Sequence, residues 1–241
     1  MPICHDREIV RPLLLRDELG TPSMYNMVFG RAGAKASWVR VDDLEDPRAV
    51  ICRWRWMYLY ATSPKAAERL VADLPRRYRV GFAATPARLI PAVKKARKMN
   101  WTALCYMYVL DPKRLVVDRR HKIGFLRPAD TPLVAKYWPH GKSRRYVGWR
   151  IRVGPTCAVR RKGKLVAWAL THGDGAMGML HVLDEYRGQG MARSITTALA
   201  ERITKRGLKP FLYIVKGNRA SINLTESMGF TRYGTYAWFG E

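Results

Sequence analysis

Helical and strand-like hydrophobic spacings alternate along the first half of the chain. Residues 53–62 (RWRWMYLYAT) alternate basic and aromatic side chains and then become apolar, which predicts one strand with a solvated face. The spacing next predicts a helix over 64–74, a strand over 80–84, a basic helix over 86–98 and a buried strand over 101–110. This half is therefore expected to be an α/β domain.

The pattern is sharper from residue 157 onward. It predicts a hairpin over 157–171, a strand over 176–183, a helix over 191–206, a strand over 211–215, a helix over 220–228 and a final strand over 231–239. The apolar face of the helix over 191–206 consists of Met191, Ile195, Ala198, Leu199 and Ile203. Gly207 follows that helix as the expected C′ residue.

A charged stretch over 111–150 separates these two patterns. It is interrupted by Pro128, Pro132, Pro139 and Gly141, and a helix over 130–137 is expected inside it. We therefore expect two domains, 1–125 and 126–241.

Composition supports a globular protein of 241 residues with 48% hydrophobic side chains. No apolar run reaches the roughly 20 residues that a membrane span needs, and the N-terminus lacks a signal-peptide apolar region. A cytoplasmic protein that does not enter membranes is expected. The 4 cysteines are scattered and do not cluster with the 5 histidines, so neither a metal site nor a disulfide framework is expected.

The positive charge is large and uneven. The chain has 44 Lys and Arg against 19 Asp and Glu, a formal net charge of +25. Residues 1–50 contain 7 basic and 8 acidic side chains, whereas residues 51–150 contain 23 and 5. This asymmetry suggests an anionic partner, with RNA or DNA as a candidate for residues 51–150. A solvated basic surface and a generally Arg-rich composition explain it equally well.

One glycine-rich segment has the letters of a dinucleotide-binding motif without its context. Residues 173–178 read GDGAMG, but a strand follows them where the motif requires the start of a helix. We interpret these glycines as a hairpin turn.

A second glycine-rich segment, LHVLDEYRGQGMAR over 180–193, has the required context. A strand ends at Leu183, an acidic turn follows, and a long helix begins after Gly190. Small residues at Gly188, Gly190 and Ala192 allow close approach of a ligand to the backbone. Free amides at the start of a helix suit a pyrophosphate group.

The spacing Arg187-x-x-Gly190-x-Ala192 resembles the signature of the GNAT acyltransferases. Asn218-x-x-Ser221-x-x-Leu224, followed by Gly229-Phe230, is similar to the second cofactor segment of that family. Ala167–Leu170, Asp184–Arg187 and Trp238-Phe239 look like its glycine N-acyltransferase-like branch. The resemblance is strong only over 150–241.

This resemblance implies an α/β (α+β) fold with a mixed, mostly antiparallel central sheet flanked by helices, preceded by a divergent N-terminal α/β domain. It implies that the strand over 176–183 splays from the strand over 211–215 to admit the pantetheine of acetyl-CoA or another acyl-CoA. The residues that it assigns to the coenzyme are Leu180, His181, Val182, Arg187, Gly188, Gln189, Gly190, Met191, Ala192, Arg193, Asn218 and Ser221. No metal is implied.

The proton handlers known in this family are replaced in this chain. Glycine N-acyltransferases carry a catalytic Glu where this chain has Ala176, and many members carry a Tyr acid where it has Thr225. Local candidates are His181 on the motif strand, Tyr213 on the neighbouring strand, and His172 and Asp174 in the preceding turn. A structural role explains each of these residues as well.

The leading function is transfer of an acyl group, with acetyl as the first candidate, from coenzyme A to a primary amine in a ternary complex. An amine on tRNA, rRNA or DNA is an alternative acceptor. Arg53–Trp56 combines positive charge with aromatic rings, and Lys94–Lys98 is a cluster of positive charge, as suits stacking on bases and contact with phosphates. A degenerate protein that binds nucleic acid or coenzyme A without turnover is a further alternative. A homodimer is compatible with the sequence.

Overall fold

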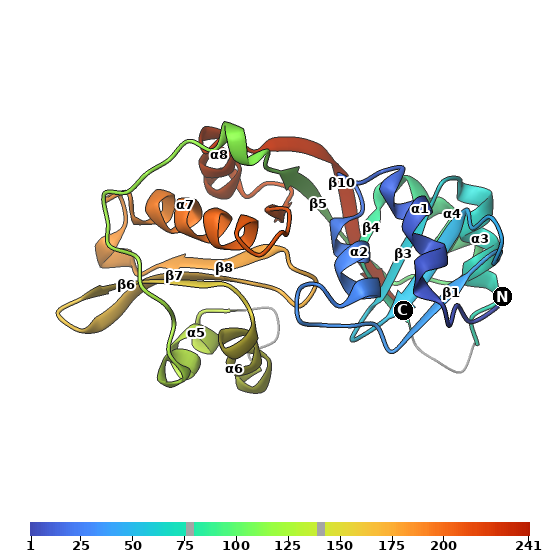
Figure 1. The fold of residues 1–241 in the computed structure, drawn as a ribbon, viewed down its shortest axis with the longest axis horizontal. Coiled ribbons are helices and arrows are strands. Elements are labelled where there is room, and N and C mark those ends of the chain that lie inside the picture. Colours follow the sequence, from blue (N-terminus) through green and yellow to red (C-terminus); the bar gives the residue numbers. More distant parts are fainter. Residues whose placement is uncertain (76–79, 139–142) are drawn as a thin grey trace. The chain divides into compact units, whose positions relative to one another are not determined.

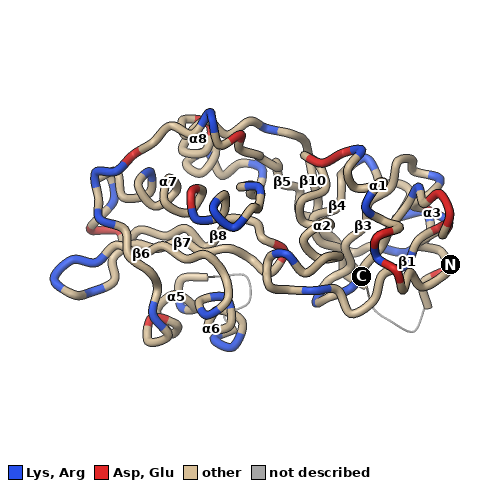
Figure 2. Tube along the Cα trace, in the orientation of Figure 1, with Lys and Arg blue, Asp and Glu red and all other residues tan. Residues whose placement is uncertain are grey.

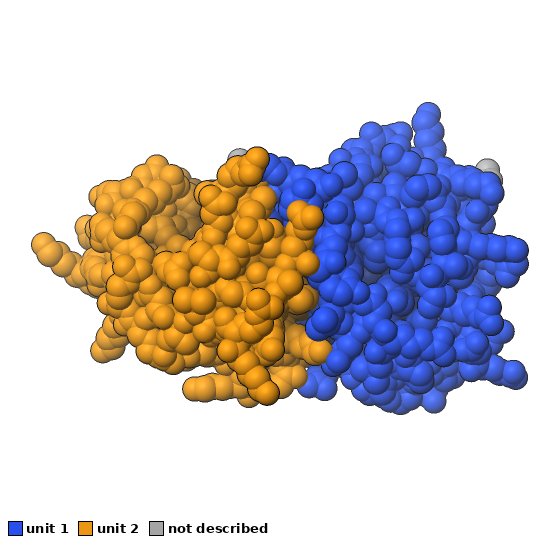
Figure 3. All heavy atoms as spheres, turned by 90° about the horizontal axis from the view of Figure 1, so that it is seen from above, with its two compact units in different colours: residues 1–107, 214–217, 233–241 blue, residues 108–213, 218–232 orange. Residues whose placement is uncertain are grey.

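The computed structural model describes residues 1–75, 80–138 and 143–241, and it divides into two compact units. Unit 1 comprises residues 1–107, 214–217 and 233–241, and unit 2 comprises residues 108–213 and 218–232 (Figure 3). The chain passes from one unit to the other within the strands β5, β9 and β10, and once more between Gly217 and Asn218. Each unit is described by itself.

Unit 1 is built on strands in the order β1-β2-β3-β4-β10-β5. Their bounds are Trp38–Val41 (β1), Ala49–Arg53 (β2), Met57–Ala61 (β3), Gly81–Pro86 (β4), Trp101–Val109 (β5) and Thr231–Gly240 (β10). The β1–β2, β2–β3 and β4–β10 pairs are antiparallel, and the β3–β4 pair is parallel.

Helices cover the central strands of unit 1, which explains their uninterrupted apolar sequences. The helices are α1 (Arg11–Leu15), α2 (Pro22–Phe29), α3 (Pro64–Ala72) and α4 (Ile90–Ala96), with 3-10 turns at Arg7–Val10 (η1) and Ala87–Leu89 (η2). Leu59 belongs to the cluster of buried residues that contains Leu70 and Val93 of α3 and α4. The rings of Phe82 and Phe239 stack at 5.0 Å and join β4 to β10 in the same core.

The single strand predicted over residues 53–62 is confirmed for Met57–Ala61, which form β3, and is wrong for the residues before them. Arg53 ends β2, Trp54 to Trp56 form a turn, and β3 begins at Met57. Cys52 pairs with Tyr58 across this hairpin. The alternation of Arg and Trp therefore reflects a turn between two buried strands.

Unit 2 has the strand order β9-β8-β7-β6. Its strands are Thr156–Arg161 (β6), Lys164–Thr171 (β7), Met177–Val182 (β8) and Phe211–Val215 (β9). The helices are Thr131–Lys136 (α5), Arg144–Val153 (α6), Met191–Thr204 (α7) and Arg219–Ser227 (α8), with 3-10 turns at Pro112–Arg114 (η3), Pro128–Asp130 (η4) and Asp184–Tyr186 (η5). The β6–β7 and β7–β8 pairs are antiparallel, and β8–β9 is parallel.

Helices lie on both faces of the β6–β8 sheet (Figure 1). Helix α7 packs on one face against all three strands, and α5 and α6 cover the other. Trp168, 1% exposed, lies in the core on the α5–α6 side with Val134 and Val147. A mixed, mostly antiparallel sheet flanked by helices, as predicted, is confirmed.

The predicted helices and strands outside residues 53–62 correspond to elements of the structure with small shifts at their ends. The glycines of 173–178 form a turn followed by β8, as expected. On the α7 face Ala200 is buried and Ala198 only half-buried. The domain boundary at 125/126 stays a prediction, and Pro139 and Gly141 lie outside the described residues.

Within the residues that the structure describes, no helix is both long and apolar enough to cross a bilayer. The same residues contain no cluster of three His, Cys, Asp or Glu side chains suited to a metal ion. All four cysteines are buried free thiols.

Candidate functional site

The central feature of the site is a distortion in β8. Trp168 of β7 faces His181 while Leu170 faces Gly178, so β8 contains one extra residue between these two pairs. Met179 lies in this bulge with a φ of 51°, which non-glycine residues rarely adopt. A bulge of this kind changes the direction of backbone groups and side chains, and β-bulges are common next to the active sites of enzymes.

On its other edge β8 separates from β9. In the described part of both strands, the parallel pairing is confined to Met177 opposite Leu212. The backbone of residues 178–182 therefore lacks a β9 ladder, as the sequence resemblance implied for these strands. Unpaired amides and carbonyls on such an edge can bind an extended ligand.

After β8, the chain turns through η5 into α7. Gly188 and Gly190 have φ values of 75° and 81°, in the left-handed region that favours glycine. A methyl group on Gly188 would meet nothing within 4 Å. The amides of Arg193 and Ser194 donate to the Gly190 carbonyl, so the helix begins there and its earlier amides point outward. This is a backbone cradle suited to a phosphate group.

Two arginines of the motif have partners near this loop. Arg187 forms an ion pair of 2.7 Å with Asp184 and donates through Nε to the Val182 carbonyl, 3.3 Å away. Arg193 donates to the Ser227 hydroxyl at 2.7 Å. Gln189 accepts at its carbonyl from His121 Nε2 at 2.7 Å, which holds the loop.

Sequence reasoning missed the cations that residues 118–121 bring to the start of α7. Asp118 is fixed by the Ser194 hydroxyl at 2.5 Å and the Thr197 hydroxyl, which its amide contacts at 3.0 Å. Its carboxylate holds Arg120 at 2.6 Å, and Arg120 lies beside Gly190. Arg120 and the Ser194 hydroxyl hold the pKa of Asp118 well below its usual range. Only the basic character of residues 51–150 pointed to this segment.

The second predicted cofactor segment begins α8. Asn218 accepts the Ser221 amide at 3.2 Å through its side-chain oxygen and thereby caps the helix. Both residues are outside the core of unit 2. Their assignment to the coenzyme stays a prediction.

The three predicted catalytic side chains are in different environments. Asp174 is 5% exposed and accepts the Ala176 amide at 3.2 Å, as in an ordinary Asx turn. Tyr213 is half-buried on β9, with its ring against the edge of Phe211. These two side chains thus have structural roles beside any catalytic one.

His181 is enclosed by aromatic rings on the α5–α6 side of β8. Its ring centroid lies 4.3 Å from that of Tyr137 and 4.9 Å from that of Trp168. Its Nε2 atom is buried and has no hydrogen-bond partner among the residues that the structure describes. Burial, followed by the charge of Arg187, lowers the pKa of His181, so the neutral form is favoured.

His172 lies next to the bulge from the turn between β7 and β8. Its Nε2 would come within 2.3 Å of a methyl group on Gly178, so the imidazole covers that glycine. Its Nδ1 lies 3.4 Å from the hydroxyl of Tyr146 in α6, which also accepts the Gly173 amide at 3.1 Å. Ala176, where the family resemblance places a Glu, is buried.

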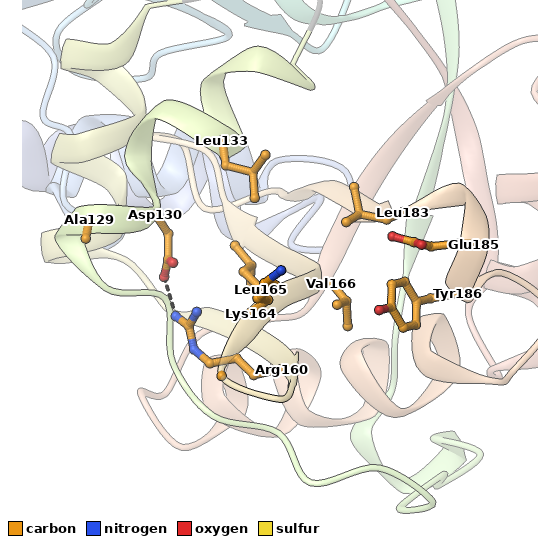
Figure 4. A pocket seen from close by; sticks show the side chains of 11 residues that line it. Ala129, Asp130, Leu133, Arg160, Lys164, Leu165, Val166, Leu183, Glu185 and Tyr186 are labelled. Atoms are coloured by element: carbon orange, nitrogen blue, oxygen red, sulfur yellow. Dashed lines mark hydrogen bonds and ion pairs between the residues drawn. The ribbon is translucent and has the colours of Figure 1, made fainter.

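A cavity of about 450 Å³ lies between α5, the β6–β7 hairpin and η5 (Figure 4). Apolar walls come from Leu133, Leu165, Val166 and Leu183. The Asp130–Arg160 ion pair, at 2.5 Å, lies at one end, and Glu185 and Tyr186 line the other. The cavity borders the motif through Leu183 and η5.

The basic residues of 51–150 do not all belong to the protein surface. Arg97 is 7% exposed and paired with Glu241 in unit 1, and Arg150 is fully buried against Thr171 in unit 2. Basic side chains also occur outside this stretch, notably at the β6–β7 turn (Figure 2). The hypothesis that residues 51–150 bind RNA or DNA therefore rests on the amino-acid sequence alone.

Comparison with known proteins gives matches concentrated in the second half of the chain. A model described as FR47-like protein, a GNAT family, matches residues 156–239. A mouse protein named glycine N-acyltransferase-like protein is 24% identical over 186 residues, which cover 74% of this chain and 63% of the mouse protein. A mycothiol acetyltransferase from Thermobispora bispora is 37% identical over 84 residues, covering 30% of this chain and 28% of that enzyme. The chain thus spans less than two thirds of either relative.

Among solved structures, the X-ray structure of a Drosophila protein has the same fold. The TM-score is 0.79 at 15% sequence identity, with 99% of this chain and 97% of the other covered. The likeness therefore extends over the first 125 residues, where the sequence resemblance was weak.

Proposed function

Because this chain belongs to the GNAT acyltransferase superfamily, we propose that it transfers an acyl group from coenzyme A to a primary amine. Acetyl is the first acyl group to test, since the Thermobispora relative is named an acetyltransferase. Glycine is the first amine to test, since the mouse relative is named for it.

One observation carries this proposal: the bulge and free edge of β8 lead directly into the glycine loop that starts α7. Met179 marks the bulge, the described pairing of β8 with β9 is confined to Met177, and Gly188 and Gly190 follow after η5. An extended ligand along β8 would therefore end with its anionic group at the helix start. Acyl-coenzyme A has this shape and charge distribution.

The residues present fit such a coenzyme. The backbone of Leu180, His181 and Val182 would hold the pantetheine along the edge that β9 leaves free. The amides from Gly188 to Ala192 would bind the pyrophosphate, with Arg187 and Arg193 adding charge. Asn218 and Ser221 complete the predicted set.

The reaction needs a donor for the carbonyl oxygen and a base for the amine. When bound, the coenzyme supplies an acyl group activated as a thioester. A backbone amide at the β8 bulge would donate to the thioester carbonyl as negative charge develops on its oxygen. His181, Tyr213 and Asp174 are the proton handlers proposed from the sequence.

The test is acetyl-CoA binding by calorimetry, followed by thiol release from acetyl-CoA with and without glycine. Saturable binding with amine-dependent thiol release supports the proposal. Absence of binding contradicts it. Binding without thiol release, with glycine or with other primary amines, would make the chain a coenzyme-binding module.

The same calorimetric cell distinguishes the nucleic-acid alternative. Adding mixed tRNA and duplex DNA at two salt concentrations shows whether the chain binds polyanions with a steep salt dependence. Such binding would direct the search toward nucleic-acid amines. Its absence would leave small-molecule and protein amines, and the charge would be a solvated surface.

A further inference from the structure

Cationic side chains from two distant segments lie beside the glycine loop that precedes α7. Arg120 belongs to the segment between η3 and η4, and Arg161 ends β6. Both residues are exposed, and neither is part of the segment over 187–193 that the family resemblance assigns to the coenzyme. The motif therefore does not account for these two cations.

A nearly buried carboxylate fixes the position of Arg120. Asp118, whose side chain is 8% exposed, accepts hydrogen bonds from Nε and Nη2 of Arg120 at 3.0 and 2.6 Å. Its second oxygen accepts the Arg120 amide at 3.2 Å and the Ser194 hydroxyl at 2.5 Å. The Arg120 side chain stays 61% exposed, and its Nη1 atom has no hydrogen-bond partner among the described residues. This edge of the guanidinium can donate to a further acceptor.

A histidine connects Arg161 to the same loop. Nη2 of Arg161 lies 2.9 Å from His121 Nδ1, and His121 Nε2 lies 2.7 Å from the carbonyl oxygen of Gln189. A guanidinium can only donate, so Nδ1 is the acceptor and the proton of the neutral imidazole is on Nε2. His121 therefore holds Arg161 near the loop without adding a charge of its own.

Both cations are at the positive end of a helix dipole. Helix α7 is 14 residues long, and its N-terminus carries a partial positive charge that favours anions and disfavours cations. On this side of the loop, Asp118 is the carboxylate that the cations contact. Arg119 of the same segment pairs instead with Glu201, further along α7. A bound anion would stabilise two arginines and a helix end that share one carboxylate.

An acyl-coenzyme A molecule has two separate anionic parts, the pyrophosphate and the 3′-phosphate of its ribose. The loop amides with Arg187 and Arg193 suit the pyrophosphate, as proposed above. The ribose joins the 3′-phosphate to the pyrophosphate, so it must lie near the loop as well. A phosphate monoester has a charge of about −1.5 to −2 at pH 7 and three strong acceptor oxygens, which suits the donors of two guanidinium groups.

We propose that Arg120 and Arg161 bind the 3′-phosphate of the coenzyme, so that the chain selects acyl-CoA over its dephospho form; this rests on the function proposed above. Asp118 is the positioning residue of Arg120, and His121 is that of Arg161. The four side chains form a specificity site beside the glycine loop, built from segments outside the motif.

The test measures the affinities of two probes by calorimetry, acetyl-CoA and acetyl-dephospho-CoA, which lacks only the 3′-phosphate. We expect the wild type to bind acetyl-CoA at least about tenfold more tightly. Arg120→Ala and Arg161→Ala should each weaken acetyl-CoA binding about fivefold and acetyl-dephospho-CoA binding less than about twofold. The ratio of the two affinities should fall accordingly.

The control is Arg206→Ala, which removes an exposed arginine beyond the far end of α7. A helix of 14 residues is about 21 Å long, so this change should leave both affinities as in the wild type. It removes the same charge from unit 2 at a distance from the loop. If Arg206→Ala lowers the affinity ratio as much as Arg120→Ala, the selection comes from the overall charge and the proposal is wrong.

The affinity for acetyl-dephospho-CoA also reports whether a variant keeps the fold of the loop. This matters for Arg120→Ala, which leaves Asp118 without its cation, whereas Arg161→Ala leaves that ion pair intact. His121→Ala should lower the affinity ratio about as much as Arg161→Ala, and the double variant should lower it no further. Additive effects of His121→Ala and Arg161→Ala would show that His121 does not act through Arg161.

Two outcomes overturn the specificity site while the proposed function stands. One is a wild type that binds both probes with equal affinity. The other is an equal loss of affinity for both probes in Arg120→Ala and Arg161→Ala, which would assign these arginines to the pyrophosphate. If neither probe binds to the wild type, the function proposed above fails together with this site.

Discussion

The guanidinium of Arg120 lies against Gly190, the N-cap residue of α7. A methyl group on Gly190 would be 2.4 Å from Nη2 of Arg120 and 2.6 Å from its Cζ. The two residues are 70 positions apart in the sequence. Glycine at this position thus meets two requirements of unequal strength: its φ of 81° disfavours any other residue, and a side chain would also displace the flexible end of Arg120.

The first prediction separates these two requirements. Gly190→Ala should lower the free energy of unfolding by more than Gly163→Ala, a control with a φ of 78° and nothing within 4 Å. Left-handed strain costs about 1–2 kcal/mol at either position. The displaced Arg120 should add about 0.5–1 kcal/mol at Gly190 only.

Urea unfolding of Gly190→Ala, Arg120→Ala and the double variant measures this coupling. In the Arg120→Ala background, Gly190→Ala should cost no more than Gly163→Ala. Additive effects, within about 0.3 kcal/mol, would contradict the contact.

Asp118 anchors Arg120, and the second prediction concerns this anchor. Asp118→Asn should lower the free energy of unfolding by about 1–3 kcal/mol at pH 7, because a nearly buried carboxylate, 8% exposed, loses hydrogen bonds to charged and hydroxyl donors. The control Asp46→Asn, at an exposed carboxylate, should change it by less than about 0.5 kcal/mol.

The difference in free energy of unfolding between the wild type and Asp118→Asn should depend on pH, because folding lowers the pKa of Asp118. The folded-state pKa of Asp118 is lowered from 3.8, so its contribution is complete above pH 4 and is lost as the pH falls through the folded-state pKa. The gap between wild type and Asp118→Asn should therefore narrow below about pH 4. A gap that stays constant down to pH 2 would show that the charge of Asp118 is not responsible.

Local patterns predicted the elements of residues 157–241 well, but not α6 in the charged stretch before them. The apolar spacing from Met191 to Ile203 and the cap at Gly207 mark α7, and the short apolar run of β9 gives its bounds as observed. These signals depend on residues that are neighbours in the sequence. The first glycine loop was found in the same way.

Features that depend on distant residues could not be predicted. Nothing near Arg120 in the sequence indicates that the chain returns to Gly190. The bulge at Met179 arises from the pairing of β8 with β7, for which Gly178 is only a weak local sign. In residues 53–62, the alternation of Arg and Trp predicts a strand, but residues 54–56 form the turn after the buried strand that contains Ala49–Cys52.

The third prediction concerns the ion pair at the end of the cavity. Asp130 and Arg160 are 10% and 20% exposed, and Asp130 also accepts the Arg127 amide at 2.6 Å. Arg160→Leu should lower the free energy of unfolding by about 3 kcal/mol, because it leaves a mostly buried carboxylate without its cation.

The control is Lys95→Leu, which breaks the more exposed pair with Glu68 in unit 1, where the two side chains are 73% and 33% exposed. It should cost at most about 1 kcal/mol. Calorimetric unfolding at pH 7 compares the two variants. Equal effects would show that burial of the Asp130–Arg160 pair does not matter to stability.

The fourth prediction follows from the burial of the thiols. Burial raises the pKa of Cys52 and Cys157 to about 12 and that of Cys105 to about 11. Since the thiolate is the reactive form, these groups should not react with an aromatic disulfide reagent at pH 8 in the folded protein. They should react fully in guanidinium chloride.

The introduced thiol of Lys65→Cys, at an exposed position of α3, is the positive control and should react within minutes. If a native thiol reacted as fast as this control, the structure around that thiol would have to open on the same timescale. Cysteine-to-serine variants would identify the reacting cysteine.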